Sequence, residues 1–583
     1  MNLQSFIPKD SIQYRLLLCL GVGFGTLLGL SPFSFLTAGI LASISCLFLF
    51  LSLDKEPFWK ASLWLLILSQ ILNYTTFPWI PGAVSRIAGT GPVVSILFFL
   101  FYGIISHLKF FPFYILFRFS KLGSIGNPWV LLVFPAAGAL ADILTYQIFP
   151  WYWGNLVSGS IVFEQFASIA GVYGLSFLLL FLSSVFLILV STIRKRDTKE
   201  FRISAVGAIG IVFIYAYGLY RIGYAVPSLN EAQPKELSVV VIQPDTSPGT
   251  KDLKADSAFL SATMSKVLSL SLQGSMSSER PPSLIVIPES SIPFHGTIDS
   301  EENRKDHIYS STMEGLILYL SKQTGADVLY NELNMDRGKL RNQISLFKNL
   351  DGSVERYNKR RLLAFGEYLP LEDQLPFLRS VFRETSRYVP GETPRLLIGN
   401  PIRKTKPIAA PEPEDISRMD DPNRFRSSFA SEAIQLEKIQ NSEYSYSILP
   451  LLCYEAMFTE LVLDYFNTGE KPEILVNITN DSWFDSELEA HQHSGTVRLR
   501  AIETGLPLIR STVSGITEVW DSRGIALIHP IGFHETAIRT FSIRLDSSVS
   551  TVYTKIGNAG IWILCILAIV FRLTFIFGNR RKV

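Results

Sequence analysis

The sequence predicts a bundle of membrane-spanning α-helices that carries one large inserted α/β domain. Of its 583 residues, 48% are hydrophobic and only 18% are charged, and the mean hydropathy is positive. The charges are also unevenly distributed: residues 225–552 hold 34 Lys and Arg and 44 Asp and Glu, whereas the rest of the chain holds 19 and 7. This contrast is typical of a water-facing domain joined to lipid-facing helices.

Seven apolar stretches in the first 224 residues are long enough to cross a bilayer. A spanning helix needs about 20 residues, because lipid offers its backbone no hydrogen-bond partners. The predicted spans are residues 13–30, 33–53, 58–77, 91–117, 128–148, 166–192 and 203–224, with an eighth at 556–576. We therefore expect about eight transmembrane helices, seven in residues 1–224 and one in residues 553–583, which end in a basic tail.

The distribution of Lys and Arg predicts the orientation of these spans, because short cytoplasmic loops carry the excess of these residues. Fifteen of them lie in the N-terminal segment, in every second loop and in the C-terminal tail, whereas Arg86 stands alone in the other short loops. Both termini are therefore expected in the cytoplasm and residues 225–552 outside it. The formal charge of the outside domain is negative, which argues against nucleic acid as a partner.

Short β-branched runs alternate with helical patterns in residues 225–552, as expected of an α/β layered domain. The predicted strands are Leu237–Gln243, Leu284–Pro288, Asp327–Asn331, Ile448–Tyr454, Ile474–Thr479 and Leu508–Val513. The predicted helices lie at about 254–272, 307–323 and 491–505. Residues 396–445 are polar and rich in proline and charge, and we expect a flexible insertion there.

Three segments place unusual polar residues next to strand-like runs: Glu289 in LIVIPESSIPF, Lys359 and Glu367 in YNKRRLLAFGEYLP, and Cys453 in ILPLLCYEAMF. Taken singly, each has an ordinary interpretation. Glu289 could be a surface turn residue, and Lys359 and Glu367 could be solvated. Cys453, the one cysteine of the exported domain, could be buried and inert, paired with another chain, or a reactive nucleophile.

Together the three segments supply a base, a cation and a nucleophile, which is the minimum set for acyl transfer through a thioester. A thiol at a strand-to-helix turn gains from the helix N-terminus and from a nearby cation, and neighbouring backbone N–H groups can stabilise an oxyanion. The combination is therefore more specific than any one of its members.

Glu, Lys and Cys in these contexts resemble the nitrilase superfamily, whose fold is an αββα sandwich. The fragments Asn480–Phe484, Gln492-His493, Arg500–Glu503 and Arg510–Thr517 are similar to that superfamily as well. A nitrilase-like domain between seven N-terminal spans and one C-terminal span resembles the bacterial apolipoprotein N-acyltransferases over nearly the whole chain. The membrane half contributes further similar fragments, which are Phe149–Leu156, Gln165 and Gly171–Ser176.

The resemblance implies roles for the three central residues. Cys453 would be the nucleophile, Glu289 the general base that takes its proton, and Lys359 the cation that holds the oxyanion together with the Tyr454 backbone N–H.

Supporting roles also follow from the resemblance. Glu367 and Glu455 would position Lys359 and the nucleophile loop. Asn342 lies where the family has an active-site Asn.

The resemblance also implies the substrates and the location. A phospholipid would donate its sn-1 acyl chain, and the N-terminal amine of a diacylglyceryl-cysteine apolipoprotein would accept it. The enzyme would need no cofactor or metal, would be a monomer, and would lie in the bacterial inner membrane with residues 225–552 on the periplasmic side. The segments Leu375–Leu378 and Val381-Phe382 could gate lipid access or simply anchor a loop.

Two features depart from the family pattern. No Trp occurs in Gln243–Asp252, where the family has one shortly after the first strand, and the 396–445 segment is longer than the usual linker. The first feature bears on substrate packing, and the second allows a modified lid or a divergent paralogue.

Other interpretations remain to be weighed. His491 and His493 form an HxH pair, but no Cys or acidic third ligand has a suitable spacing for a metal. The resemblance to the nitrilase superfamily implies that His493 is structural. Asp142 and Glu164 could serve a transporter. The main rival function is a membrane-tethered nitrilase-type amidase that hydrolyses a soluble amide. A transporter or scaffold with a decayed domain would not need Cys453.

Overall fold

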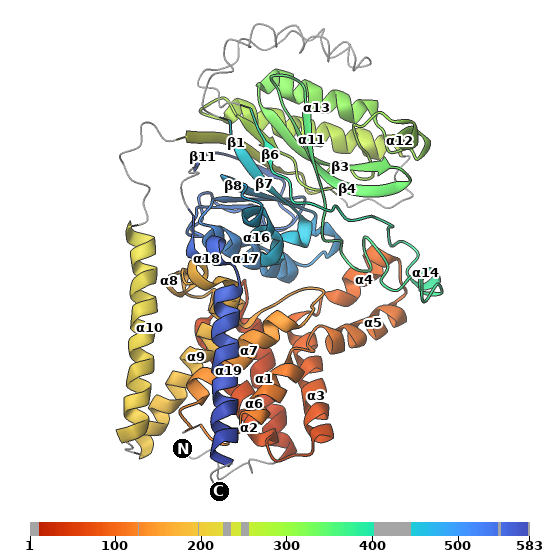
Figure 1. Ribbon diagram of the computed structural model, residues 1–583. Helices are drawn as coiled ribbons and strands as arrows, with labels where there is room; N and C mark the ends of the chain where they lie inside the picture. Colours follow the sequence, from red (N-terminus) through yellow and green to blue (C-terminus); the bar gives the residue numbers. More distant parts are fainter. Residues whose placement is uncertain are drawn as a thin grey trace.

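The computed structural model describes residues 11–125, 127–195, 198–224, 235–246, 256–400, 445–545 and 550–580. A helical half and a layered α/β half are stacked end to end, with α4, α5 and α14 projecting at one side of their junction (Figure 1). Helix α19 (Ala559–Arg580) follows the α/β half and runs back through the helical half, away from the sheets (Figure 1).

The helical half begins with α1, a helix whose N-cap Ser11 side chain accepts from the Tyr14 N–H. Its other elements follow in chain order. The bounds are α1 Ile12–Gly29, α2 Leu36–Leu53, α3 Phe58–Thr76, α4 Ile80–Ala88, α5 Pro92–Ile105, α6 Phe110–Phe119, α7 Val130–Leu144, η2 Trp153–Val157, α8 Ile161–Glu164, α9 Ala167–Lys195 and α10 Thr198–Tyr224.

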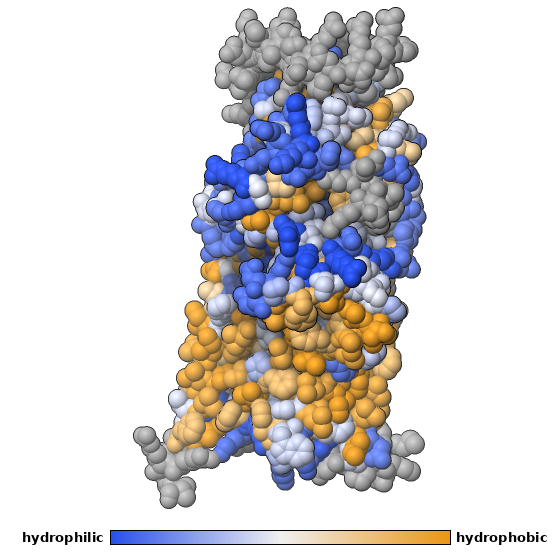
Figure 2. Space-filling view, turned by 90° about the vertical axis from the view of Figure 1, so that its right-hand side faces the viewer, coloured by the Kyte–Doolittle hydropathy of each residue, from blue (hydrophilic) through white to orange (hydrophobic). Residues whose placement is uncertain are grey.

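Among the described residues, six helical segments are long and apolar enough to cross a membrane. They are Ile12–Gly29, Leu36–Leu53, Pro92–Phe119, Ala167–Ile193, Glu200–Gly223 and Ala559–Phe577. The other two predicted spans correspond to helix α3 and to the shorter apolar helix α7, so the count of about eight is not confirmed. Figure 2 shows one side of the whole molecule, with a broad hydrophobic band in its lower part and mainly hydrophilic residues above that band.

The predicted span 91–117 is interrupted, because helices α5 and α6 are separate at residues 106–109. At the break the Lys109 ammonium turns inward, donating to Asp142 at 2.9 Å and to the Trp151 carbonyl at 2.7 Å. Asp142 also accepts from the Trp153 N–H at 2.9 Å and from the Ser176 hydroxyl at 2.8 Å. Asp142 is thus fully engaged in holding residues 151–153, which accounts for this buried acid without a transport role.

The α/β half contains two sheets and the helices that cover them. Its elements are β1 Lys235–Gln243, α11 Ser257–Ser277, β2 Leu284–Val286, α12 Glu301–Lys305, α13 Ser311–Thr324, β3 Asp327–Asp336, β4 Lys339–Phe347, β5 Val354–Asn358, α14 Leu378–Val381, β6 Leu397–Ile398, β7 Ser447–Leu452, η5 Cys453–Met457, α16 Thr459–Asn467, β8 Ile474–Thr479, η6 Asp481–Trp483, α17 Glu487–Thr504, β9 Leu508–Thr512, β10 Glu518–Trp520, β11 Ala537–Leu545 and α18 Val552–Ile556.

The strand orders are β11-β1-β2-β3-β4-β5 in one sheet and β10-β9-β8-β7-β6 in the other. Alternate side chains of β1 separate into two cores, because successive residues of a strand point to opposite faces. Val239 and Val241 join the core that contains the second sheet, whereas Val240 and Ile242 pack with residues of α11 and α13. The result is the predicted αββα sandwich, with parallel pairs β1-β2-β3 and β7-β8-β9 at its centre.

The start of the predicted insertion at 396–445 contains a strand instead. Leu397–Ile398 form β6, which pairs with Ile448 and Ser447, and Leu397 is fully buried. Residues 401–444 lie outside the described residues, as do residues 247–252 of the segment that lacks the family Trp.

Polar contacts join the two halves at their junction. The Val172 N–H donates to Glu503 at 2.8 Å, and the Tyr173 hydroxyl donates to Glu460 at 2.6 Å. Arg498 forms an ion pair at 2.6 Å with Glu164, which explains the second acid singled out in the sequence. These contacts fix the position of α16 and α17, and with them the turn after β7, relative to the helical half.

We predict that breaking the buried Lys109–Asp142 pair destabilises the whole chain. Replacing one partner, as in Lys109→Met or Asp142→Asn, leaves an uncompensated buried group and should lower the free energy of unfolding by about 3–5 kcal/mol. Chemical denaturation in detergent measures this. The double variant should lose less than the sum of the single losses, and strictly additive losses would contradict the coupling.

Candidate active site

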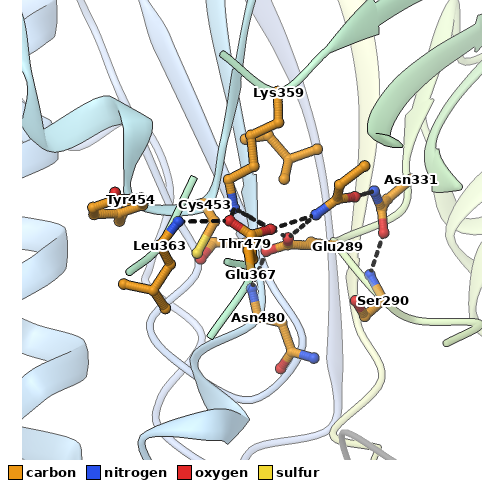
Figure 3. Close-up of polar contacts among 12 residues, drawn as sticks. Glu289, Ser290, Asn331, Lys359, Leu363, Glu367, Cys453, Tyr454, Thr479 and Asn480 are labelled. Atoms are coloured by element: carbon orange, nitrogen blue, oxygen red, sulfur yellow. Dashed lines mark hydrogen bonds and ion pairs between the residues drawn. The ribbon is translucent and has the colours of Figure 1, made fainter. Parts of the chain in front are cut away.

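The predicted residues converge at one edge of the two sheets, because the three central ones each follow the end of a strand (Figure 3). Glu289 follows β2, Lys359 follows β5 and Cys453 follows β7. Asn342 lies within β4, opposite Leu333 of β3. All are buried in the folded chain.

Cys453 is the first residue of η5 and follows β7 directly at a sharp turn. Its φ of 56° is in the left-handed region, which is unusual for a residue with a side chain. The Asn477 amide donates to the Cys453 carbonyl at 2.9 Å and holds the turn. The Cys453 side chain and Glu289 line the same cavity. The nucleophile and its candidate base therefore face one enclosed space.

The Lys359 ammonium is enclosed by carboxylates. It donates to Glu367 at 2.9 Å and lies 3.7 Å from Glu289 Oε1. Glu367 also accepts from the Leu363 N–H at 2.8 Å, which fixes the loop between them. Lys359 thus faces the Cys453–Glu289 pair from a rigid support (Figure 3).

Asn342 connects the two carboxylates. Its amide nitrogen donates to Glu289 at 3.1 Å and to Glu367 at 2.9 Å, and its oxygen accepts from Asn331 at 2.7 Å. The Asn480 N–H donates to the other oxygen of Glu289 at 3.1 Å. Both Glu289 oxygens are thus oriented by amide donors.

Glu455 braces the nucleophile turn against the Lys359 loop. It accepts from the Leu452 N–H at 2.8 Å, from the Arg360 N–H at 2.6 Å and from the Tyr357 hydroxyl at 3.0 Å. The Tyr454 hydroxyl donates to the Leu362 carbonyl. The backbone N–H of Tyr454 follows Cys453 directly in the chain.

The site's pKa values are coupled through burial and charge. Burial raises the pKa of Glu289 above its ordinary value of 4.5, despite the opposing Lys359 charge, and burial also raises the pKa of the Cys453 thiol. Burial alone would lower the pKa of Lys359, but Glu367 and the other acidic groups around it raise that pKa well above its ordinary value. Cys453 therefore rests as a thiol beside a permanent cation, and a base must remove its proton during attack.

A cavity of about 580 Å³ opens over this site. Both halves line it: Glu289, Asn342, Lys359 and Cys453 come from the α/β half, whereas Arg86, Ile87 and Gly89 come from α4 and the residue that ends it. Next to it is an apolar crevice between α4 and residues 363–366. Ile87, Leu363, Gly366 and Phe484 line both spaces, so the polar site borders a hydrocarbon-like surface.

The structure brings together all seven residues that the sequence singled out: the three central ones and their supports Asn342, Glu367, Tyr454 and Glu455. Sequence reasoning missed Asn331, Thr479 and the Asn480 N–H as partners. The NDSWF motif that begins at Asn480 was noted only as a resemblance. Its position directly after β8, a strand parallel to β7, was the signal that could have placed it beside Cys453.

His493 has acidic neighbours, contrary to the expectation that none was suitably spaced. Its Nδ1 lies 3.3 Å from Asp481 and 3.5 Å from Glu489, and the three ligand atoms lie within 4.8 Å of one another. Asp481 is also held by Arg510 at 2.7 Å. Burial and Arg510 would lower the pKa of His493, but its ion pairs with the two acids raise that pKa above its ordinary value. His491 instead lies 4.0 Å from Glu487.

A Cys, Glu and Lys set on an αββα sandwich defines a carbon-nitrogen hydrolase domain, and residues 254–551 match the Carbon-nitrogen hydrolase family. Residues 23–185 match the Apolipoprotein N-acyltransferase N-terminal domain. The chain therefore belongs to the apolipoprotein N-acyltransferase family of membrane-integral carbon-nitrogen hydrolases.

Two similar proteins cover most of the chain, and a solved structure covers a little over half of it. "Apolipoprotein N-acyltransferase 1" of Leptospira interrogans is 68% identical over 99% of both chains. The Haemophilus influenzae apolipoprotein N-acyltransferase is 26% identical over 86% of this chain and 84% of its own. A solved carbon-nitrogen hydrolase from Helicobacter pylori is 13% identical, with a TM-score of 0.33, over 57% of this chain and 94% of its own.

We predict that Glu455→Gln separates the nucleophile turn from the Lys359 loop. A carboxamide has one acceptor oxygen and would place an NH₂ group against buried donors, so we expect a loss of about 2–3 kcal/mol in the free energy of unfolding. Denaturation in detergent measures it. Glu470→Gln, the same change at an exposed residue, serves as the control and should have no measurable effect.

The raised pKa of Glu289 predicts the acidic limb of the reaction. A carboxyl base works only when ionised, so the rate of Cys453 acylation should fall as the pH decreases, with a midpoint above 4.5. Single-turnover rates between pH 4 and 8 measure this. A rate that stays constant down to pH 4.5 would show that Glu289 is not the base.

Proposed function

We propose that this protein transfers a fatty acyl chain from a membrane phospholipid to the N-terminal amine of the diacylglyceryl-cysteine of apolipoproteins, through a thioester on Cys453. The placement of Cys453 and Glu289 in one cavity, with the buried Lys359 ammonium 3.7 Å from Glu289, carries the proposal. The whole-chain similarity to proteins named apolipoprotein N-acyltransferase supports it.

In the first half-reaction, Glu289 takes the thiol proton while the Cys453 sulfur attacks the carbonyl carbon of the sn-1 ester. The negative charge that develops on the carbonyl oxygen is stabilised by Lys359 and by the Tyr454 backbone N–H. Collapse of the tetrahedral intermediate breaks the ester bond, and the proton on Glu289 passes to the departing lysophospholipid oxygen. An acyl-enzyme remains.

In the second half-reaction, the acceptor amine attacks the thioester carbon. Glu289 accepts a proton from the amine, the same cation holds the oxyanion, and the Cys453 sulfur leaves and regains its proton. The rigid contacts of Glu367, Glu455 and Asn342 serve both halves, because neither half requires Lys359 or the base to move.

The membrane position suits two lipid-anchored substrates. With both termini in the cytoplasm, the site would lie at the periplasmic surface of the inner membrane, and the apolar crevice beside the cavity would receive acyl chains. The proposal needs one copy of the chain and no cofactor. It includes Leu375–Leu378 as a lipid-facing loop, because Phe377 is 61% exposed.

A tethered amidase would use the same three residues with water as the acceptor. It would have no use for a crevice of apolar side chains that borders the cavity of the nucleophile and reaches α4, and the family to which the chain belongs favours acyl transfer.

Incubation with phospholipid should add the mass of one acyl chain to the intact protein and release lysophospholipid. Cys453→Ser should slow this by at least roughly a thousandfold, because a hydroxyl is a far weaker nucleophile in this site. Intact-mass measurement follows both species. Cys565→Ala, which changes a buried thiol in α19, should acylate normally. Folded wild-type protein that gains no acyl chain would overturn the proposal.

A further inference from the structure

Arg86 has an unusual position in the sequence and no role in the mechanism proposed above. It is the single Lys or Arg in the short loops predicted to face outward, where such residues are normally scarce. It lies on α4, a helix of nine residues at the junction of the two halves (Figure 1). The apolar side of α4, with Ile80, Ala83 and Val84, is buried, whereas the Arg86 side chain is 39% exposed.

The Arg86 guanidinium lines the same cavity as Cys453. Ile87, the next residue, lines both this cavity and the apolar crevice. A charged group of a lipid and the start of its acyl chain would therefore meet adjacent residues of α4.

The guanidinium is held in place by backbone groups. Its Nε donates to the Trp483 carbonyl at 3.2 Å, and Nη2 donates to the Phe484 carbonyl. Nη1 lies 3.5 Å from Asp485, well beyond the 2.7–2.9 Å of a charge-assisted hydrogen bond. Asp485 is itself 52% exposed and is also paired with His534 at 3.1 Å. The Arg86 side chain is thus oriented, yet one of its donor nitrogens has only a loose partner.

The charged residues that line the cavity leave Arg86 as the cation available to an anionic ligand. Glu289, Glu367 and Glu384 line the cavity, and among its described lining residues Lys359 and Arg86 are the Lys and Arg side chains. Lys359 is engaged with Glu367 and Glu289. An anionic ligand entering this acid-rich cavity therefore has Arg86 as its available counter-charge.

We propose that Arg86 binds the phosphodiester of the acyl-donor phospholipid, and of the lysophospholipid product, and so selects donors that carry a phosphate. This inference rests on the proposed function. A guanidinium suits the role because its planar set of N–H groups matches phosphate oxygens. A phosphate on Nη1 would replace the loose contact with Asp485 while the two carbonyl contacts stay in place.

The test is protection of Cys453 from alkylation by two lipids with the same single acyl chain, lysophosphatidylethanolamine and monoacylglycerol. The full-length protein in neutral detergent is treated with iodoacetamide, and the modified Cys453 peptide is quantified by mass spectrometry. In wild type, the phosphate-bearing lipid should protect at a concentration about tenfold lower, the effect of one charge-assisted hydrogen bond. Arg86→Gln should abolish the difference and leave the monoacylglycerol curve unchanged, and Arg86→Lys should retain part of it.

Asp485→Asn separates phosphate binding from a role in joining α4 to residues 483–485. If Arg86 binds phosphate, this variant keeps or increases the preference, because a competing carboxylate is removed. The inference is overturned if wild type shows no preference, if Arg86→Gln keeps it, or if Arg86→Gln and Asp485→Asn weaken protection by both lipids equally. Failure of wild type to form an acyl-enzyme from intact phospholipid would instead contradict the proposed function, and the protection curves would still be readable.

Discussion

The buried ammonium of Lys359 is the charge around which the site is organised. A cation removed from water is stable only when carboxylates and hydrogen bonds surround it. Glu367 and Glu289 supply the carboxylates. The Asn342 amide lies between the two acids and donates to both. The same arrangement leaves Glu289 beside the Cys453 thiol. Stability of the folded site and readiness for chemistry therefore come from one set of contacts.

The sequence predicted the parts of the fold that have a strong periodic pattern. The runs before Glu289 and Cys453 are buried on both faces and contain mostly aliphatic residues, so their strands and the polar residues that end them were evident. Strand β11 was not predicted because its residues are mostly half-buried. Helix α4 was not predicted because it is a short helix inside a predicted loop. Asp481 beside His493 could not be foreseen, since it approaches from a different element, whereas Glu489 lies one helical turn before His493 on α17.

The two halves are joined by side chains that also surround the nucleophile. Lys109 and Asp142 hold residues 151–153 inside the helical half. Just before them in the chain, the Phe149 ring lies 6.4 Å from the ring of Tyr454 and 5.5 Å from that of Phe484. A disturbance deep among the helices can therefore reach the residue after Cys453 through a few packed groups, which explains how polar residues far from the chemistry could affect it.

Both halves of the chain contribute to the wall of the cavity, so the complete active site forms only when the two halves have docked. Arg86, Ile87 and Gly89 belong to the helical half, while the nucleophile and base belong to the other. An α/β half that had not yet docked on its helices would present an open, water-exposed surface in place of an enclosed cavity, with no wall to hold an acyl chain. Acylation or hydrolysis before the two halves have docked is thereby disfavoured.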